Sequence, residues 1–160
     1  MEQTTFQALA EKYMDSVYRV AYNCLKSPHD ADDVTQEVFL RLLRTDTAFQ
    51  SEAHAKHWLL RVAVNESRRL AGSPWRRHTA ALEDYAQTLE WETPQESDLF
   101  RQVMALPAKY RVPLYLFYYE ELSTQEIAAV LGRSPSTVRT QLSRAREQLK
   151  SLLLEEWSDA

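Results

Sequence analysis

Residues 122–149 read LSTQEIAAVLGRSPSTVRTQLSRAREQL, and this stretch decides the fold of the second half of the chain. Ser123 and Glu126 form the S-x-x-E pattern of a helix start, in which side chains and backbone amides cap each other. Gly132 suits the end of that helix, and Ser134-Pro135 supplies an N-cap and a first helical residue. The stretch therefore predicts two helices joined by a tight turn.

The second of these helices carries small polar and basic residues opposite its apolar stripe. Residues 133–150 include five basic residues and one acid, in a chain that is acidic as a whole. Arginine pairs bidentately with guanine, while hydroxyls and helix N-termini suit phosphates. The pattern is typical of a helix-turn-helix that reads the major groove, although an ordinary solvated helix pair would share it. The predicted DNA-binding residues are Arg133, Ser134, Ser136, Thr137, Arg139, Thr140, Ser143 and Arg144.

Glycine is scarce, with two residues in 160, which disfavours sheet turns and glycine-rich phosphate loops. Helical spacing of apolar residues over 6–25, 31–42, 56–70 and 96–160 predicts an all-α protein. The Ser27-Pro28 step is expected to end the first helix. Thr45–Ala55 is polar and predicts an irregular loop. We expect two small helical domains, 1–72 and 96–160, joined by a tether over 73–95 with a short helical piece around 80–87.

Charge and composition exclude several classes of protein. The chain has 19 basic and 23 acidic residues, a net charge of −4, so it is no polybasic binder. It shows neither the ~18-residue apolar run of a membrane span nor an export signal. A single cysteine, Cys24, can form neither an internal disulfide nor a zinc site of its own. We expect a cytoplasmic setting, no metal and no cofactor.

Two further clusters stand in the first half. Asp30–Glu37 is an acidic helix start, which by its pattern alone favours a solvated, capped face. Phe49–Arg69 combines a polar loop with aromatic residues and a polar stripe at helical spacing. Amides, arginines and aromatic planes are what unstacked bases need. An alternative interpretation is that Trp58 packs in the core and the arginines form a solvated edge, and composition does not distinguish this from a base-binding surface.

Five motifs together resemble the extracytoplasmic-function (ECF) sigma factors, the smallest members of the sigma-70 family. They are DADDVTQEVFLRL at 30–42, WLLRVAVN at 58–65, LPAKYR at 106–111, EIAAVLG at 126–132 and TVRTQLSRAR at 137–146. Their order and spacing are those of the family over about residues 5–154. The resemblance implies that 1–72 grips the polymerase clamp and opens the −10 promoter element. It also implies that 96–160 reads the −35 element and rests on the polymerase flap.

The resemblance assigns roles to single residues as well. It implies polymerase contacts at Asp33, Gln36 and Glu37, and places a flipped-out base of the non-template strand in the 49–55 loop. The −10 residues it implies are Phe49, Gln50, Ser51, Arg61, Asn65 and Arg69. The implied partners are core RNA polymerase, promoter DNA and an anti-sigma factor, which in this family is often membrane-bound. Many members have glycine where this chain has Glu121 and Ser136.

Three other functions compete with this interpretation. A stand-alone helix-turn-helix regulator would bind a symmetric operator without polymerase. An enzyme would need a catalytic cluster, but the four histidines, His29, His54, His57 and His78, stand at no ligand spacing. An adaptor protein would still need the acidic helix, but its function would not change when the charges of Arg139 and Arg144 are neutralised.

Overall fold

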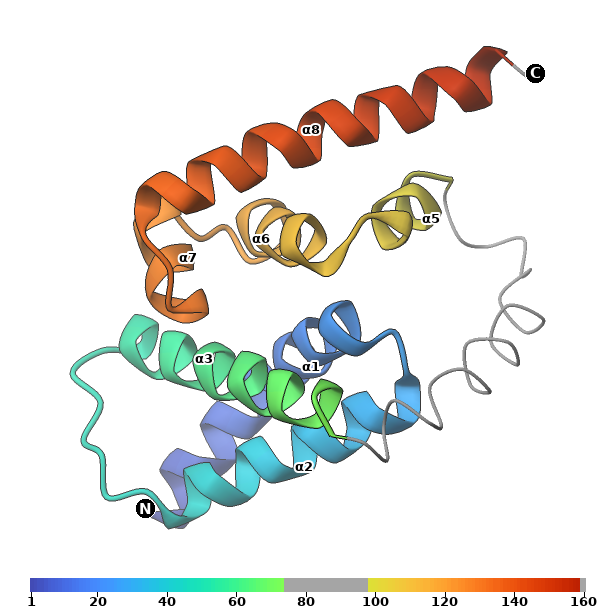
Figure 1. The fold of residues 1–160 in the computed structure, drawn as a ribbon. Helices are drawn as coiled ribbons and strands as arrows, with labels where there is room; N and C mark the ends of the chain where they lie inside the picture. Colours follow the sequence, from blue (N-terminus) through green and yellow to red (C-terminus); the bar gives the residue numbers. More distant parts are fainter. Residues whose placement is uncertain (74–97, 159–160) are drawn as a thin grey trace. The chain divides into compact units, whose positions relative to one another are not determined.

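The structure, a computed structural model, describes residues 1–73 and 98–158, and every regular element within them is an α-helix (Figure 1). The chain divides into two compact units, Met1–Glu83 and Asp84–Ala160. The prediction of an all-α protein is confirmed for the described residues. The predicted tether, with its short helical piece around 80–87, lies outside the described residues except for Ser73.

Three helices, each packed on the other two, build the N-terminal unit: α1 (Gln3–Leu25), α2 (Pro28–Arg44) and α3 (Glu52–Ala71) (Figure 1). Each helix contributes side chains that are completely buried, such as Val17 of α1, Leu42 of α2 and Leu59 of α3. Burying one such side chain contributes about 1.5–3 kcal/mol. The apolar spacing seen in the sequence is therefore the stripe that forms this core.

The junction between α1 and α2 differs from the expectation. The Ser27-Pro28 step opens α2, because Ser27 Oγ accepts the Asp30 N–H at 3.2 Å and Pro28 is the first helical residue. The first helix already ends at Leu25, where Lys26 adopts a left-handed φ of 57°. The step thus acts as a cap and first residue of the next helix, a role that proline fills well.

The start of α3 also corrects a prediction. The helix was expected from about Lys56, after an irregular stretch to Ala55, but it begins at Glu52. Ser51 is its N-cap, and Ser51 Oγ accepts the His54 N–H at 3.1 Å. The first turn is mostly exposed and has no apolar period, so periodicity alone misses it. The connection that carries Phe49 is therefore only residues 45–51.

Four helices form the C-terminal unit: α5 (Asp98–Ala105), α6 (Ala108–Tyr118), α7 (Thr124–Leu131) and α8 (Pro135–Ser158). The long helix α8 packs against the other three (Figure 1). Ile127 of α7 and Val138 and Ala145 of α8 are completely buried. The predicted helix pair with a turn at Gly132 is confirmed, since Gly132 has the left-handed φ of 67° that suits glycine.

Glu121 lies in the turn before α7 with a left-handed φ of 57°. A side chain in this region costs about 1–2 kcal/mol, whereas glycine pays only part of that in backbone entropy. We expect Glu121→Gly to raise the free energy of unfolding by about 0.5–1 kcal/mol in denaturant titrations. Ser136→Gly is the matched control, because Ser136 is helical and its replacement should destabilise. Equal effects of the two changes would contradict the role of φ.

Candidate functional site

The helix-turn-helix of the C-terminal unit is fixed by local hydrogen bonds. Ser123 Oγ accepts the Glu126 N–H at 3.1 Å, and Glu126 Oε1 accepts the Ser123 N–H at 2.9 Å, which completes the predicted capping box. After Gly132, the Arg133 N–H donates to the Ala128 carbonyl at 2.9 Å. These bonds satisfy the ends of α7 and set the direction in which α8 begins.

At the start of α8, three hydroxyls are used locally. Ser134 Oγ accepts the Thr137 N–H at 3.1 Å and lies 2.8 Å from Thr137 Oγ1. Thr140 Oγ1 donates to the Ser136 carbonyl at 3.1 Å. Ser134, Ser136, Thr137 and Thr140 are nevertheless exposed, as are Arg139, Ser143 and Arg144, while Arg133 is half-buried. The predicted polar outer face of this helix is therefore present.

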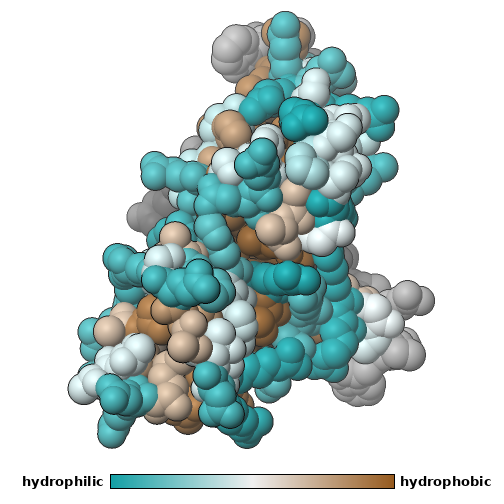
Figure 2. Space-filling view, turned by 90° about the vertical axis from the view of Figure 1, so that its left-hand side faces the viewer, coloured by the Kyte–Doolittle hydropathy of each residue, from teal (hydrophilic) through white to brown (hydrophobic). Residues whose placement is uncertain are grey.

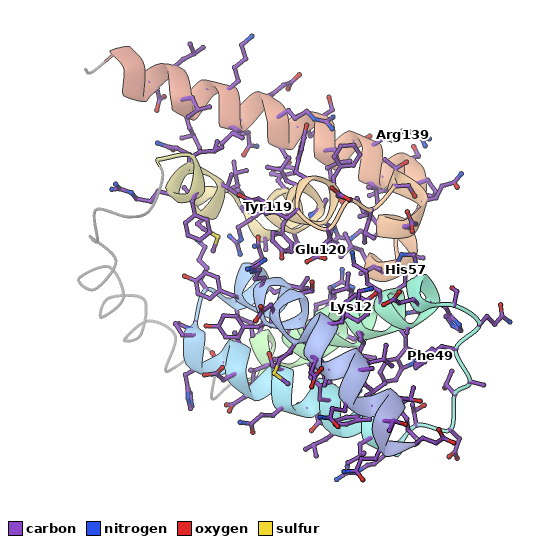
Figure 3. All side chains as sticks on the ribbon, turned by 180° about the vertical axis from the view of Figure 1, so that it is seen from behind. Lys12, Phe49, His57, Tyr119, Glu120 and Arg139 are labelled. Carbon is purple, nitrogen blue, oxygen red and sulfur yellow. The ribbon has the colours of Figure 1, made fainter. Side chains whose placement is uncertain are left out.

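The arginines on this face are not equivalent. Burial favours a higher pKa for the Tyr110 hydroxyl, but hydrogen bonds from Arg144 and Lys109 outweigh it and the pKa of Tyr110 is lowered. Arg144 is thus engaged by α6. Arg139, in the first turns of α8 (Figure 3), has no hydrogen-bond or ion-pair partner among the described residues. Arg139 is consequently the one of the three predicted arginines that is most available to a ligand.

Arg146 has a structural role that the sequence did not indicate. Its Nε donates to the Tyr118 hydroxyl at 2.9 Å, and its guanidinium lies 5.3 Å and 5.6 Å from the ring centroids of Phe117 and Tyr118. Such cation–π contacts hold α8 to the C-terminal end of α6. Arg146 stands in the TVRTQLSRAR motif, but it packs against aromatic rings of its own unit.

In the N-terminal unit, the loop before α3 is closed by an aromatic cluster. The Phe49 ring lies edge-on to His54 at 5.3 Å and to Trp58 at 5.7 Å between centroids. The Gln50 N–H donates to His54 Nδ1 at 3.1 Å. Trp58 is half-buried, so it belongs partly to the core and partly to this cluster. The loop is thereby anchored on the first two turns of α3.

An open groove of about 480 Å³ runs between this loop and the start of α1, lined by Thr4, Thr5, Ala8, Leu9, Phe49, Ser51, Glu52 and Ala55. Beside this groove, an ion pair between Lys12 of α1 and Glu52 of α3 joins the two helices. Hydrogen bonding between these two groups lowers the pKa of Glu52 and raises that of Lys12. Lys12 and Phe49 are both marked in Figure 3. Phe49 is half-buried and contributes to the lining of this groove.

The predicted polar stripe of α3 is present on one face of the helix. Arg61, Asn65 and Arg69 follow each other at intervals of four residues and are exposed. His57, one turn earlier and labelled in Figure 3, is half-buried. Residues at this spacing lie one above the other on a helix. The stripe begins at His57, between His54 and Trp58 of the Phe49 cluster, so the loop and the stripe adjoin.

A chain of alternating charges, Glu37–Arg41–Glu66–Arg69, joins α2 to α3. Arg41 Nε donates to Glu37 Oε1 at 3.1 Å, and Arg41 Nη2 lies 2.5 Å from Glu66 Oε1. Glu66 Oε2 accepts hydrogen bonds from Nε and Nη2 of Arg69, at 3.1 Å and 2.9 Å. Hydrogen bonding to Glu66 raises the pKa of Arg69 above its usual value. Neither Arg41 nor Glu66 was among the predicted site residues.

The outer face of α2 combines acidic and apolar side chains. Asp33 and Gln36 are exposed, and Glu37 is half-buried beside Arg41. Leu40 and Leu43, one and two turns further, are 43% and 47% exposed. On the face drawn in Figure 2, hydrophilic side chains surround separate hydrophobic patches. Exposed leucines beside carboxylates are typical of a protein interface with a basic partner.

Residues 1–73 and 98–158 contain no group of three or more His, Cys, Asp or Glu side chains that could hold a metal ion. In the same ranges, no helix has the length and apolarity needed to cross a membrane.

Two protein families match the sequence, one in each unit. Residues 9–79 match the family described as Sigma-70 region 2, and residues 97–149 match the one described as Sigma-70, region 4. The helix-turn-helix with its Arg139 face lies in the second range, and the charge chain and α3 stripe lie in the first. The two matches stand in the order that the motifs predicted.

Two relatives described as ECF RNA polymerase sigma factors are similar to nearly the whole of this chain. The ECF RNA polymerase sigma factor SigE of Mycolicibacterium smegmatis is 32% identical over 165 residues, covering 97% of this chain. This chain spans 64% of that relative's length. The ECF RNA polymerase sigma factor SigW of Bacillus subtilis is 27% identical, with 95% of this chain and 90% of the relative covered.

Solved structures show the same fold. The sigma factor RpoE of Bartonella quintana, in complex with the anti-sigma factor NepR, superposes with a TM-score of 0.71 at 19% identity, covering 93% of this chain and 96% of that one. CnrH in complex with the cytosolic domain of CnrY gives 0.65 at 24% identity, covering 95% and 89%.

Proposed function

Since the chain belongs to the sigma-70 family as an ECF sigma factor, we propose that it is a promoter-specificity subunit of bacterial RNA polymerase. It binds the core enzyme, selects promoters and helps to open the duplex for transcription initiation. The observation that carries the proposal is the presence of both sigma regions on one chain, each with an exposed face suited to its task. Catalysis belongs to the core polymerase, and this chain acts in the cytoplasm without a catalytic centre.

The N-terminal unit captures separated DNA at the −10 element. Unstacking a base costs a few kcal/mol, and binding it on an aromatic ring or in a pocket offsets that cost. Phe49, Gln50 and Ser51 receive a base of the non-template strand, and Arg61, Asn65 and Arg69 follow the strand along α3. The aromatic cluster with His54 and Trp58 supports this assignment, because it holds the Phe49 ring in place.

The C-terminal unit reads the −35 element through α8. Arg139, which has no hydrogen-bond or ion-pair partner among the described residues, contacts a base, while the remaining predicted residues contact phosphates or base edges. These residues are Arg133, Ser134, Ser136, Thr137, Thr140, Ser143 and Arg144. Because the whole chain has a net charge of −4, we expect the core polymerase to supply most of the grip on the backbone.

Protein partners complete the proposal. The acidic and apolar face of α2, with Asp33, Gln36 and Glu37, docks on the polymerase clamp, and the C-terminal unit rests on the flap. The solved relatives are described in complexes with the anti-sigma factor NepR and with the cytosolic domain of CnrY. An anti-sigma factor, soluble or membrane-bound, is by analogy a partner of this chain.

Charge reversal on α2 tests the clamp assignment. Asp33 is exposed, with only a 3.7 Å contact to His29 Nε2. We expect Asp33→Arg to weaken binding to core polymerase at least tenfold, because like charges would face each other across the interface. Titration of labelled protein with core polymerase measures this. Asp15→Arg on α1 makes the same charge change and should bind normally, and start sites at saturating Asp33→Arg protein should stay the same.

Run-off transcription tests the proposed function itself. Purified core polymerase is given fragmented genomic DNA with and without this chain, and start sites are mapped. We expect a new and reproducible set of start sites only with the chain present. Unchanged start sites would overturn the proposal. Tight, sequence-specific binding to a symmetric DNA site without polymerase would instead identify a stand-alone regulator.

A further inference from the structure

Within the charge chain, Glu66 differs from its partners in exposure. The Glu66 side chain is 4% exposed, whereas those of Arg41 and Arg69 are 45% and 69% exposed. A carboxylate removed from water is tolerated only where donors replace its hydration. Guanidinium groups from α2 and α3 do this on both oxygens of Glu66. Glu66 is therefore an anchored anion, and Arg69 is a mostly exposed cation attached to it.

The geometry also determines which edge of Arg69 is occupied. Nε and Nη2 both donate to Glu66 Oε2, so the side edge of the guanidinium is used. The end edge, formed by Nη1 and the second hydrogen of Nη2, is left for another acceptor. A planar guanidinium edge matches two oxygens of a phosphate. Arg69 continues the α3 stripe of Arg61 and Asn65, so this edge belongs to the proposed strand-binding face.

We propose that Glu66 is a positioning residue for promoter binding: it holds Arg69 so that its remaining guanidinium edge meets a backbone phosphate of the separated strand. This inference rests on the proposed function and adds to it a residue that does not itself touch DNA. An arginine that is already immobilised loses less side-chain entropy on binding, so the contact gains affinity. Arg41 fixes the second oxygen of Glu66 and thereby keeps the carboxylate in place.

The sign of the effect separates positioning from simple electrostatics. Removing a negative charge beside a DNA-binding face strengthens binding to a polyanion when only charge matters. If Glu66 positions Arg69, Glu66→Gln weakens binding instead, because Arg69 keeps its charge and loses its fixed orientation.

The test uses holoenzyme assembled from core polymerase and the full chain. The probe is a forked fragment of a mapped promoter with an unpaired −10 non-template strand, titrated at several salt concentrations. We expect Glu66→Gln to weaken binding about three- to tenfold, with unchanged affinity for core polymerase. Arg69→Gln should weaken it similarly and lower the salt slope by about 0.7–0.9. In the Arg69→Gln background, Glu66→Gln should have no further effect.

Two additional variants serve as controls for misfolding and for unrelated effects of charge. Arg69→Lys lies on the surface and keeps the charge, but its ammonium has no planar second edge that a contact with Glu66 could hold towards a phosphate. It should lose affinity while keeping the salt slope. Arg68→Gln removes a charge from the neighbouring position, and Glu66→Gln should still weaken binding in that background.

Several results would overturn the role of Glu66. They are equal or tighter binding by Glu66→Gln, wild-type binding by Arg69→Lys, and additive effects of Glu66→Gln and Arg69→Gln. A wild-type holoenzyme without promoter preference would overturn the proposed function itself, so the two failures are distinguishable.

Discussion

Replacing Leu142 with alanine is expected to lower the free energy of unfolding of the C-terminal unit by about 2–5 kcal/mol, the largest effect on stability that we predict. Leu142 is 2% exposed, between the exposed residues Thr140 and Ser143 of α8. A unit of roughly 65 residues has a total stability of about 3–10 kcal/mol. The substitution therefore removes a large part of it and should impair the proposed −35 reading without changing any residue assigned to DNA.

Hydrogen exchange measured by mass spectrometry locates this loss. Amides of residues 98–158 should exchange faster in Leu142→Ala, while those of 1–73 keep their protection. Leu59→Ala, at a fully buried position of α3, is the matched control and should produce the opposite pattern. Equal loss of protection in both units would contradict the prediction.

Arg139→Ala has the largest expected effect on DNA binding. Arg139 is exposed and has no hydrogen-bond or ion-pair partner among the described residues, so its removal leaves the fold intact. Loss of a bidentate base contact should cost about 1–3 kcal/mol of promoter affinity and relax the preference at one base of the −35 element. Holoenzyme binding to promoter variants with each −35 base changed in turn measures both effects.

Lys150→Ala is the control for Arg139→Ala. Lys150 is an exposed cation on the same helix, eleven residues further, and was not assigned to DNA. Its loss should leave the base preference unchanged. An unaltered start-site profile with Arg139→Ala would remove Arg139 from the residues proposed to read the −35 element.

Much of the local structure follows from residues that are close together in the chain. The capping box of Ser123 and Glu126 and the left-handed Gly132 need no distant partner, so the sequence predicts them correctly. The exposed positions of Arg61, Asn65 and Arg69 follow from the helical period in the same way. The predicted start of α3 was wrong, because the first turn of this helix has an N-cap residue but no apolar stripe.

The resemblance predicted which residues meet polymerase and DNA, yet it gave no information on how they are held. The spacing of Glu66 and Arg69 is visible in the sequence, but the contact from Arg41 is not, since it crosses from one helix to another. The engagement of Arg144 by Tyr110 likewise depends on how α8 packs against α6. Arg144 and Arg139 look alike in the sequence and differ only in the fold.

The sequence by itself therefore determined the all-α class, the caps of α7 and α8, the family and the exposed faces, because these depend on neighbours within about four residues or on motifs in order. Tertiary structure alone decided which charged groups on those faces are engaged. Arg146 packs on aromatic rings of α6, and Arg41 of α2 reaches Glu66 of α3. Such partners are set by the relative rotation and distance of packed helices, which the spacing of residues along one helix does not specify.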